Sequence, residues 1–120
     1  MLQLTSHMRL LLCIQPADFR KGLDALIALC REKLQEDPFS GSVFAFRNQS
    51  GTAVKFLIYD GTGFWLCLKR FSQGRLKWWP TAKGLVELIT PAELHILLRQ
   101  GDPSRVRLSQ DWRPITPKLN

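Results

Sequence analysis

The apolar residues of this 120-residue chain change their spacing near residue 43, and this change restricts the fold more than any other feature. Upstream of it, apolar side chains recur at intervals of three and four, as on one face of an amphipathic helix. They are Phe19, Leu23, Leu26, Ile27, Cys30 and Leu34. Downstream, the spacing becomes two, which indicates β-strands. The sequence therefore predicts an α+β fold.

Two prolines bound the helical segment. Pro16 fits the first turn of a helix. Pro38 disfavours helical backbone at the residue before it, so we expect one long helix between them. Arg20 and Lys21 would then lie in its first turn.

The apolar run at residues 9–14 is predicted as a buried strand rather than a signal peptide, because Pro16 follows it so closely.

After residue 43 we predict an antiparallel meander of strands at residues 43–46, 54–59, 64–70 and 75–79. With the strand at 9–14 this makes a sheet of about four to five strands, and the long helix packs on one face of it.

A short C-terminal helix follows the meander. Thr90 is its expected N-cap, Pro91 its first residue and Glu93 the capping-box partner. We expect residues 1–112 to form a single domain. Residues 113–120, which are basic and contain prolines, form a flexible tail in this interpretation.

The hairpin around Asp60 to Gly63 allows two registers. A two-residue loop at Gly61-Thr62 puts one face of the first strand beside Trp65, Cys67 and Lys69. A three-residue loop, Gly61 to Gly63, instead gathers the strongest apolar residues of both strands on one face. These residues are Val54, Phe56, Ile58, Phe64, Leu66 and Leu68. We choose the three-residue loop for that reason.

Positive charge is concentrated in the second half of the chain. Lys and Arg number 17 against 10 Asp and Glu, a net charge of +7, and no acid lies between Asp60 and Glu87. Such asymmetry favours one electropositive surface and a polyanionic partner, with nucleic acid the default candidate. A basic domain without such a partner is the alternative.

In the chosen register, cations and planar rings alternate on the other sheet face, which suits phosphate contact and base stacking. A helix N-terminus near Arg20 and Lys21 would add an anion site. The predicted DNA-binding residues are Arg20, Lys21, Lys55, Tyr59, Trp65, Lys69, Arg70, Arg75, Lys77 and Trp79. The same surface suits equally an interface with a second copy or another protein.

Trp78 and Trp79 must face opposite ways, and the sequence leaves open which is exposed.

Patterns typical of enzymes and metal sites are sparse. His7 and His95 lack a second ligand at metal spacing, and no zinc or phosphate-loop motif occurs. The enzyme alternative is a metal-dependent nuclease that uses Asp60 at a strand end. Turn chemistry already accounts for Asp60 before Gly61, so we expect no enzyme and no cofactor.

The cysteines and hydropathy bear on location. Cys13, Cys30 and Cys67 are odd in number and lie in apolar runs, which favours reduced, buried thiols in the cytoplasm. No apolar run approaches the roughly 18 residues that a membrane span needs, so no membrane contact is expected.

Two groups of residues, in a particular order and spacing, resemble a known family. The first is Pro16, Asp18, Arg20-Lys21-Gly22, Asp24, Asp37-Pro38-Phe39-Ser40-Gly41, Phe44 and Phe46. The second is Lys55, Asp60-Gly61, Gly63-Phe64, Lys69-Arg70, Gly74 and Trp79-Pro80. From about Arg9 to Gly101 the chain is similar to the TnpB-type accessory protein of bacterial insertion sequence 66 elements, encoded by their second open reading frame.

This resemblance implies a protein that assists transposition beside a separate, larger transposase, and it implies no catalytic residues. We therefore expect a non-enzymatic accessory factor that binds DNA with weak sequence specificity, the element's transposase, or both. A pure protein adaptor without DNA affinity is the remaining alternative.

Overall fold

The structure is a computed structural model that describes residues 8–81 and 83–105. Its strands are β1 (Leu10–Cys13), β2 (Val43–Arg47), β3 (Ala53–Tyr59), β4 (Phe64–Arg70) and β5 (Val86–Ile89). Its helices are α1 (Leu23–Ala28), which continues as the π-helical turn η1 (Leu29–Lys33), and α2 (Pro91–Leu98). The predicted α+β class is confirmed. The predicted tail, residues 113–120, lies outside the described residues.

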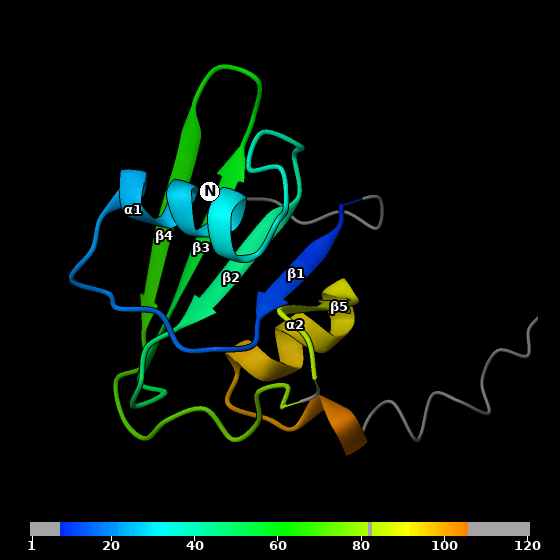
Figure 1. The fold of residues 1–120 in the computed structure, drawn as a ribbon. Coiled ribbons are helices and arrows are strands. Elements are labelled where there is room, and N and C mark those ends of the chain that lie inside the picture. The colour runs from blue at the N-terminus through cyan, green and yellow to red at the C-terminus, as the bar shows by residue number, and fades with distance from the viewer. Residues whose placement is uncertain (1–7, 82, 106–120) are drawn as a thin grey trace, which may run out of the picture.

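The strands form one mixed sheet in the order β4-β3-β2-β1-β5 (Figure 1). β2, β3 and β4 form the predicted antiparallel meander. β1 pairs parallel to β2, however, so the prediction of a wholly antiparallel sheet is wrong. Parallel neighbours cannot be joined by a tight turn, and the connection here runs through α1 and η1.

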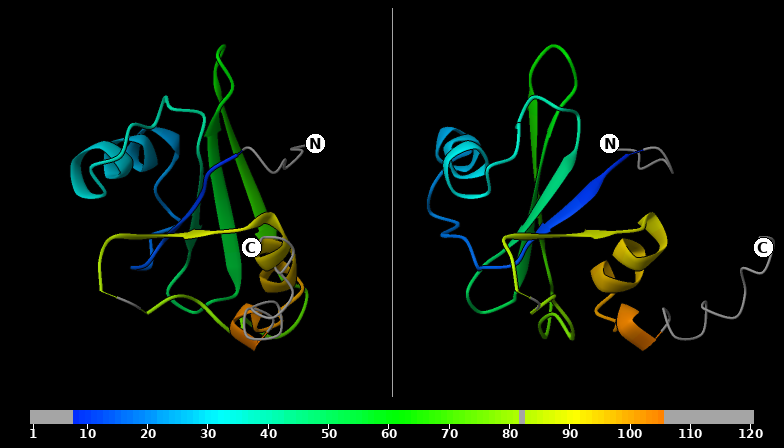
Figure 2. Two further views of the ribbon diagram at one scale, coloured as in Figure 1. Left: turned by 90° about the vertical axis from the view of Figure 1, so that its right-hand side faces the viewer. Right: turned by 45° about the vertical axis from the view of Figure 1, so that its right-hand side comes forward.

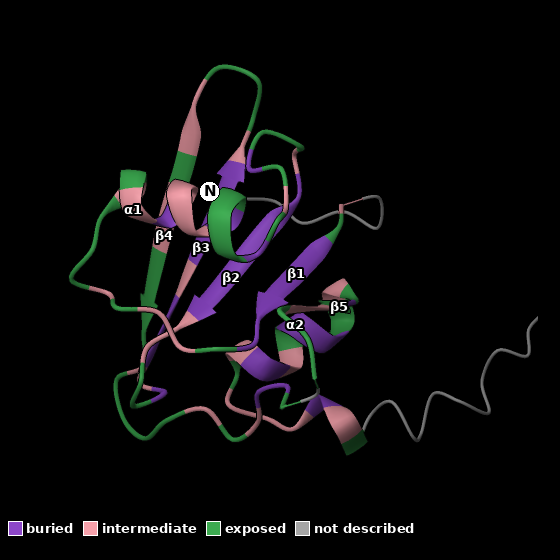
Figure 3. Ribbon diagram, in the orientation of Figure 1, coloured by how far each residue is buried: buried purple, intermediate pink, exposed green. Residues whose placement is uncertain are grey.

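Helices cover both faces of this sheet. The left view of Figure 2 shows α1 and α2 on opposite sides of the strands. Leu11, Phe44 and Leu57 face the α1 side, whereas Leu12, Ala45 and Phe56 face the α2 side. β1 is buried along its whole length, and β2 is buried except at Arg47 (Figure 3). Strands that are enclosed on both faces need apolar side chains on both, which explains the continuous apolar run of β1.

The first helix is shorter than predicted, and it begins later. It starts at Leu23, not Pro16, because Asp18 organises a turn instead: its carboxylate accepts hydrogen bonds from the backbone N–H and the guanidinium of Arg20. Helical structure ends at Lys33, and Gln35 then adopts a φ of 55°. Arg20 and Lys21 therefore lie in a loop and not in the first turn of a helix.

Residues 75–79 do not form the predicted fourth strand of the meander. The backbone N–H of Leu76 bonds to Gly51 O at 2.8 Å, and Trp79 Nε1 donates to Cys13 O at 2.9 Å. These bonds tie the segment to the turn between β2 and β3 and to β1, so it does not pair with β4. The fifth strand is β5, which the sequence analysis missed and which pairs antiparallel with β1.

The register of the β3–β4 hairpin is the one that we rejected. Phe56 lies opposite Cys67, and Val54 opposite Lys69. The backbone N–H of Asp60 bonds to Gly63 O, so Gly61 and Thr62 make a two-residue loop, with Gly61 at a φ of 99°. The choice failed because it assumed one apolar face, whereas the sheet buries both. Trp65 and Lys69 consequently share a face with Phe56.

Helix α2 begins as predicted. The Thr90 side chain accepts from the backbone N–H of Glu93, and the Glu93 side chain accepts from that of Thr90, which completes the capping box with Pro91 inside it. The cap seats Leu94 and Leu97 in the core on this side of the sheet. None of the helices in the described ranges is long and apolar enough to cross a bilayer.

We expect Thr90→Ala to lower the free energy of unfolding by about 1 kcal/mol, because the backbone N–H of Glu93 loses the Thr90 hydroxyl as its partner. Thr90→Ser keeps the hydroxyl and should lose only a small part of that. Urea denaturation followed by circular dichroism measures both. Equal midpoints for the alanine variant and the wild type would show that the cap does not contribute.

Candidate nucleic-acid interface

The structure does not bring the ten predicted DNA-binding residues onto one face. Lys55 and Tyr59 alternate with the buried residues of β3 and lie on the α1 side. Trp65 and Lys69 lie on the α2 side. The predicted sheet surface of alternating cations and rings is therefore divided between two faces, because it depended on the rejected register.

Several of the predicted side chains have partners within the protein. Lys55 Nζ donates to Phe19 O at 2.9 Å and lies 4.9 Å from the Phe19 ring centre. Lys69 Nζ donates to Leu98 O at 3.0 Å, at the C-terminal end of α2. Each lysine thus ties a strand to the element that covers its face of the sheet.

The predicted aromatic residues are also held internally. The Tyr59 hydroxyl donates to Gly61 O, and its ring packs against Phe39 and Phe64 at 5.0 Å between centres. Trp79 is buried, so of the two neighbouring tryptophans Trp78 is the more exposed.

Asp60, the residue of the nuclease alternative, organises the hairpin loop. Its carboxylate accepts from the backbone N–H groups of Thr62 and Gly63, from the Thr62 hydroxyl and from Trp65 Nε1 at 2.8 Å. These hydrogen bonds, those of Thr62 foremost, lower the pKa of Asp60 to about 2. No group of three or more His, Cys, Asp or Glu side chains that could hold a metal ion occurs in residues 8–81 and 83–105.

The low pKa of Asp60 makes hairpin stability depend on pH. The ionised carboxylate stabilises the fold above the ordinary Asp pKa of 3.8, and this contribution is lost as the pH falls towards about 2. We expect the wild type to exceed Asp60→Asn in urea midpoint at pH 5, and the difference to shrink steadily down to pH 2. The indole N–H resonance of Trp65 should move over the same range. A constant difference between the two proteins would contradict this role of Asp60.

The remaining predicted cations point to one end of the molecule, where β1 and β2 end. Here three adjoining hollows are lined by loops. The first, of about 570 Å³, lies between Pro16–Arg20 and Asn48–Ser50. The second, of about 210 Å³, lies between Arg47, Gln49–Gly51 and Leu76–Trp79. The third, of about 650 Å³, is formed by Ser72–Lys77 with Gln100. We call residues 16–20, 47–51 and 72–79 the loop surface.

Hydrogen bonds hold the three loops of the loop surface together. The Asn48 side chain accepts from the backbone N–H groups of Thr52 and Ala53, which shapes the turn after β2. Gly51 then takes a φ of 72°, and its carbonyl accepts the backbone N–H of Leu76 at 2.8 Å. The Gln100 side chain donates to the carbonyls of Gln73 and Arg75 and holds the far side of the third hollow.

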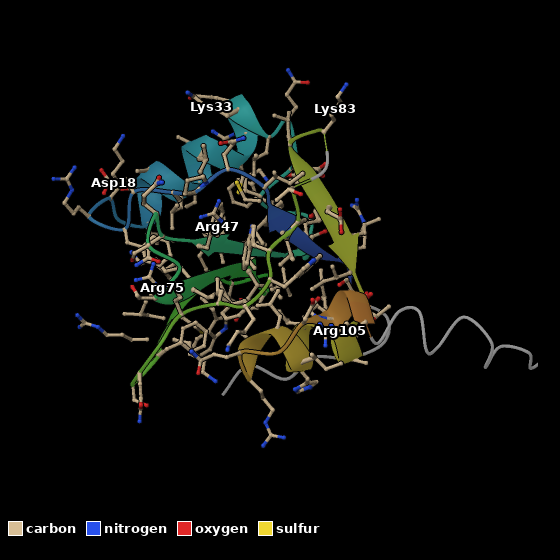
Figure 4. All side chains as sticks on the ribbon, turned by 90° about the horizontal axis from the view of Figure 1, so that it is seen from below. Asp18, Lys33, Arg47, Arg75, Lys83 and Arg105 are labelled. Carbon is tan, nitrogen blue, oxygen red and sulfur yellow. The ribbon has the colours of Figure 1, made fainter. Side chains whose placement is uncertain are left out.

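The loop surface is electropositive. It carries Arg20, Arg47, Arg75 and Lys77, and Asp18 is the one carboxylate among the residues that line the three hollows. Asp18 is already neutralised by Arg20 at 3.0 Å, which lowers the pKa of Asp18 to about 2. Figure 4 looks at this end of the molecule and shows Arg47 between Asp18 and Arg75. Lys21 and Arg70 are exposed nearby, before α1 and at the end of β4.

Sequence reasoning missed Arg47 and Trp78. The sequence analysis did not consider Arg47, and it placed Trp79, not Trp78, among the DNA-binding residues because the predicted strand 75–79 put Trp79 on the same face as Lys77. The available signal for Arg47 was a basic residue that directly follows the buried run Val43–Phe46 with no acid near it in sequence. Its neighbours from the loop after β4 could not be found from sequence spacing.

Comparisons with known proteins identify the family. Residues 8–107 match the family described as IS66 Orf2 like protein. The chain belongs to this family. Its resemblance to the second-open-reading-frame proteins of insertion sequence 66 elements is thereby confirmed, and the family has an accessory role associated with transposition.

Relatives of similar length occur in Sinorhizobium fredii. The uncharacterized protein y4jC is 31% identical over 89% of this chain and 91% of its own length. The uncharacterized protein y4hO is 34% identical over 95% of this chain and 96% of its own. No solved structure matches the chain.

Proposed function

We propose that this protein is a non-enzymatic accessory factor of transposition that binds the phosphate backbone of the element's DNA with its loop surface. The observation that carries the proposal is the set of cations around three adjoining hollows, with one carboxylate that is already paired. The family, whose role is associated with transposition, supports the choice of DNA as the polyanion.

Of the residues predicted from sequence, five belong to this proposal. They are Arg20, Lys21, Arg70, Arg75 and Lys77, which are exposed. Arg47 joins them from the structure. Mobile, exposed cations contact phosphates without reading bases, so binding is weakly sequence-specific. We expect roughly three to five phosphate contacts and a log–log salt slope of about −3 to −4.5.

Arg75→Ala combined with Lys77→Ala should weaken binding to duplex DNA and flatten the salt slope by about two units, because two phosphate contacts are lost. Fluorescence anisotropy between about 50 and 200 mM salt measures both quantities.

A matched control removes two charges from the opposite end of the sheet. Arg9 precedes β1, and Arg31 lies over Phe39, which packs against the hairpin end of β3. Arg9→Ala with Arg31→Ala should leave the slope nearly unchanged. Equal losses in both double variants would mean that net charge, and not the loop surface, governs binding.

Contact with the element's transposase is a second candidate function, and the exposed apolar side chains of both edge strands favour it. β4 exposes Trp65 (51%) and Leu68 (59%), and β5 exposes Leu88 (56%). Large apolar side chains on unpaired strand edges are typical of protein interfaces, including those between two copies of one chain. A pull-down with the transposase, with and without the terminal inverted repeats, separates the roles. Transposase capture by a protein that shows no DNA binding at low salt would leave the adaptor function standing.

A further inference from the structure

We propose that the hollow around Arg47 is a phosphate subsite, in which the guanidinium of Arg47 holds one backbone phosphate of the bound nucleic acid while Lys77 and Trp78 contact its neighbours. This inference rests on the proposed function and deepens it, because it assigns a half-buried anchor to a surface whose other cations are exposed.

Arg47 differs from the other cations of the loop surface in its burial. It is the last residue of β2, pairs with Val54 and is half-buried among Leu76, Trp78 and Trp79. Its backbone is held as well, since its carbonyl accepts from the N–H of Ala17 at 2.9 Å. A guanidinium on such a support is restrained, whereas that of Arg75 is exposed and has no partner among the described residues.

The guanidinium of Arg47 is incompletely paired. Its Nε is buried and has no hydrogen-bond partner among the described residues. Its Nη1 lies 3.5 Å from Asn48 O, at the outer limit of a hydrogen bond. No described carboxylate lies within ion-pair distance of it. The buried Nε is out of a ligand's reach, so an anion would bind the Nη groups of this half-buried charge, which has no opposite charge beside it among the described residues.

The surroundings of Arg47 suit a phosphate. The hollow measures about 210 Å³. Ser50, Gly51 and Lys77 line it beside Arg47. Phosphate oxygens accept the parallel donors of a guanidinium in a bidentate pair. The Trp78 indole at the rim offers an apolar surface for the adjoining sugar or base.

The buried Nε–H of Arg47 allows a direct test by ¹⁵N–¹H NMR on the wild-type protein. We expect its resonance to shift when duplex DNA of about 20 base pairs is added, since a phosphate bound at the Nη groups changes the electrostatic environment of the whole guanidinium. Inorganic phosphate should shift the same resonance, whereas chloride at equal ionic strength should not. Loss of the peak in Arg47→Lys assigns it.

Affinity gives the second measurement. Arg47→Lys keeps the charge but loses the bidentate geometry, so we expect DNA binding about tenfold weaker. The matched control, Arg9→Lys, changes an exposed arginine before β1, outside the loop surface, and should cost less than about threefold. Urea denaturation shows whether each variant is folded. The NMR titration is carried out on the wild-type protein, so its result does not depend on the folding of a variant.

The outcomes separate this subsite from the proposed function. If DNA binds but the Arg47 resonance stays still and Arg47→Lys binds like the wild type, the subsite is refuted and DNA binding stands. If DNA does not bind at all, the proposed function fails, and the phosphate titration alone decides whether the hollow is an anion site. A response to phosphate that equals the response to chloride overturns the subsite in either case.

Discussion

Enclosure of the sheet on both faces is the constraint on which the rest of the structure depends. β1 lies between β2 and β5, is buried along its length and brings α1 over one face through its parallel connection to β2. The other face is closed by α2 and by the segment that carries Trp79, whose indole N–H bonds to Cys13 O. With the central strands covered on both sides, a partner can reach the loops where β1 and β2 end, and this is where the loop surface lies.

Local sequence patterns predicted what short-range physics determines. The capping box of α2 needs only Thr90, Pro91 and Glu93, and the turn at Asp60 needs only the next three residues. The strands β2 to β4 likewise follow from alternation and turn residues. Burial of Cys13 and Cys30 was also predicted, and burial raises the pKa of the Cys30 thiol to about 12.

What failed depended on contacts between distant residues. The hairpin register was chosen by collecting apolar residues on one face, and that rule is invalid once Leu57 and Leu66 have α1 to pack against. The segment 75–79 alternates like a strand, but Leu76 bonds to Gly51 and Trp79 to Cys13. The parallel pairing of β1 with β2 was foreseeable from a strand–helix–strand order, since parallel neighbours require such a connection. The candidate site inherited the register error, and only its loop residues remain together.

Some cations of this protein are bonded within the fold and others are not. The net charge therefore overstates the charge available to a partner. Lys55 and Lys69 each give their ammonium group to a backbone carbonyl, at Phe19 and at the end of α2. A cation at a helix C-terminus is stabilised by the helix dipole, so Lys69 strengthens the contact between β4 and α2. Arg20 is paired with Asp18. Arg75 and Lys77 have neither kind of partner among the described residues, and Arg47 has only a weak one. Because these three lie on adjoining hollows, a small number of uncompensated charges is concentrated at one end of the molecule.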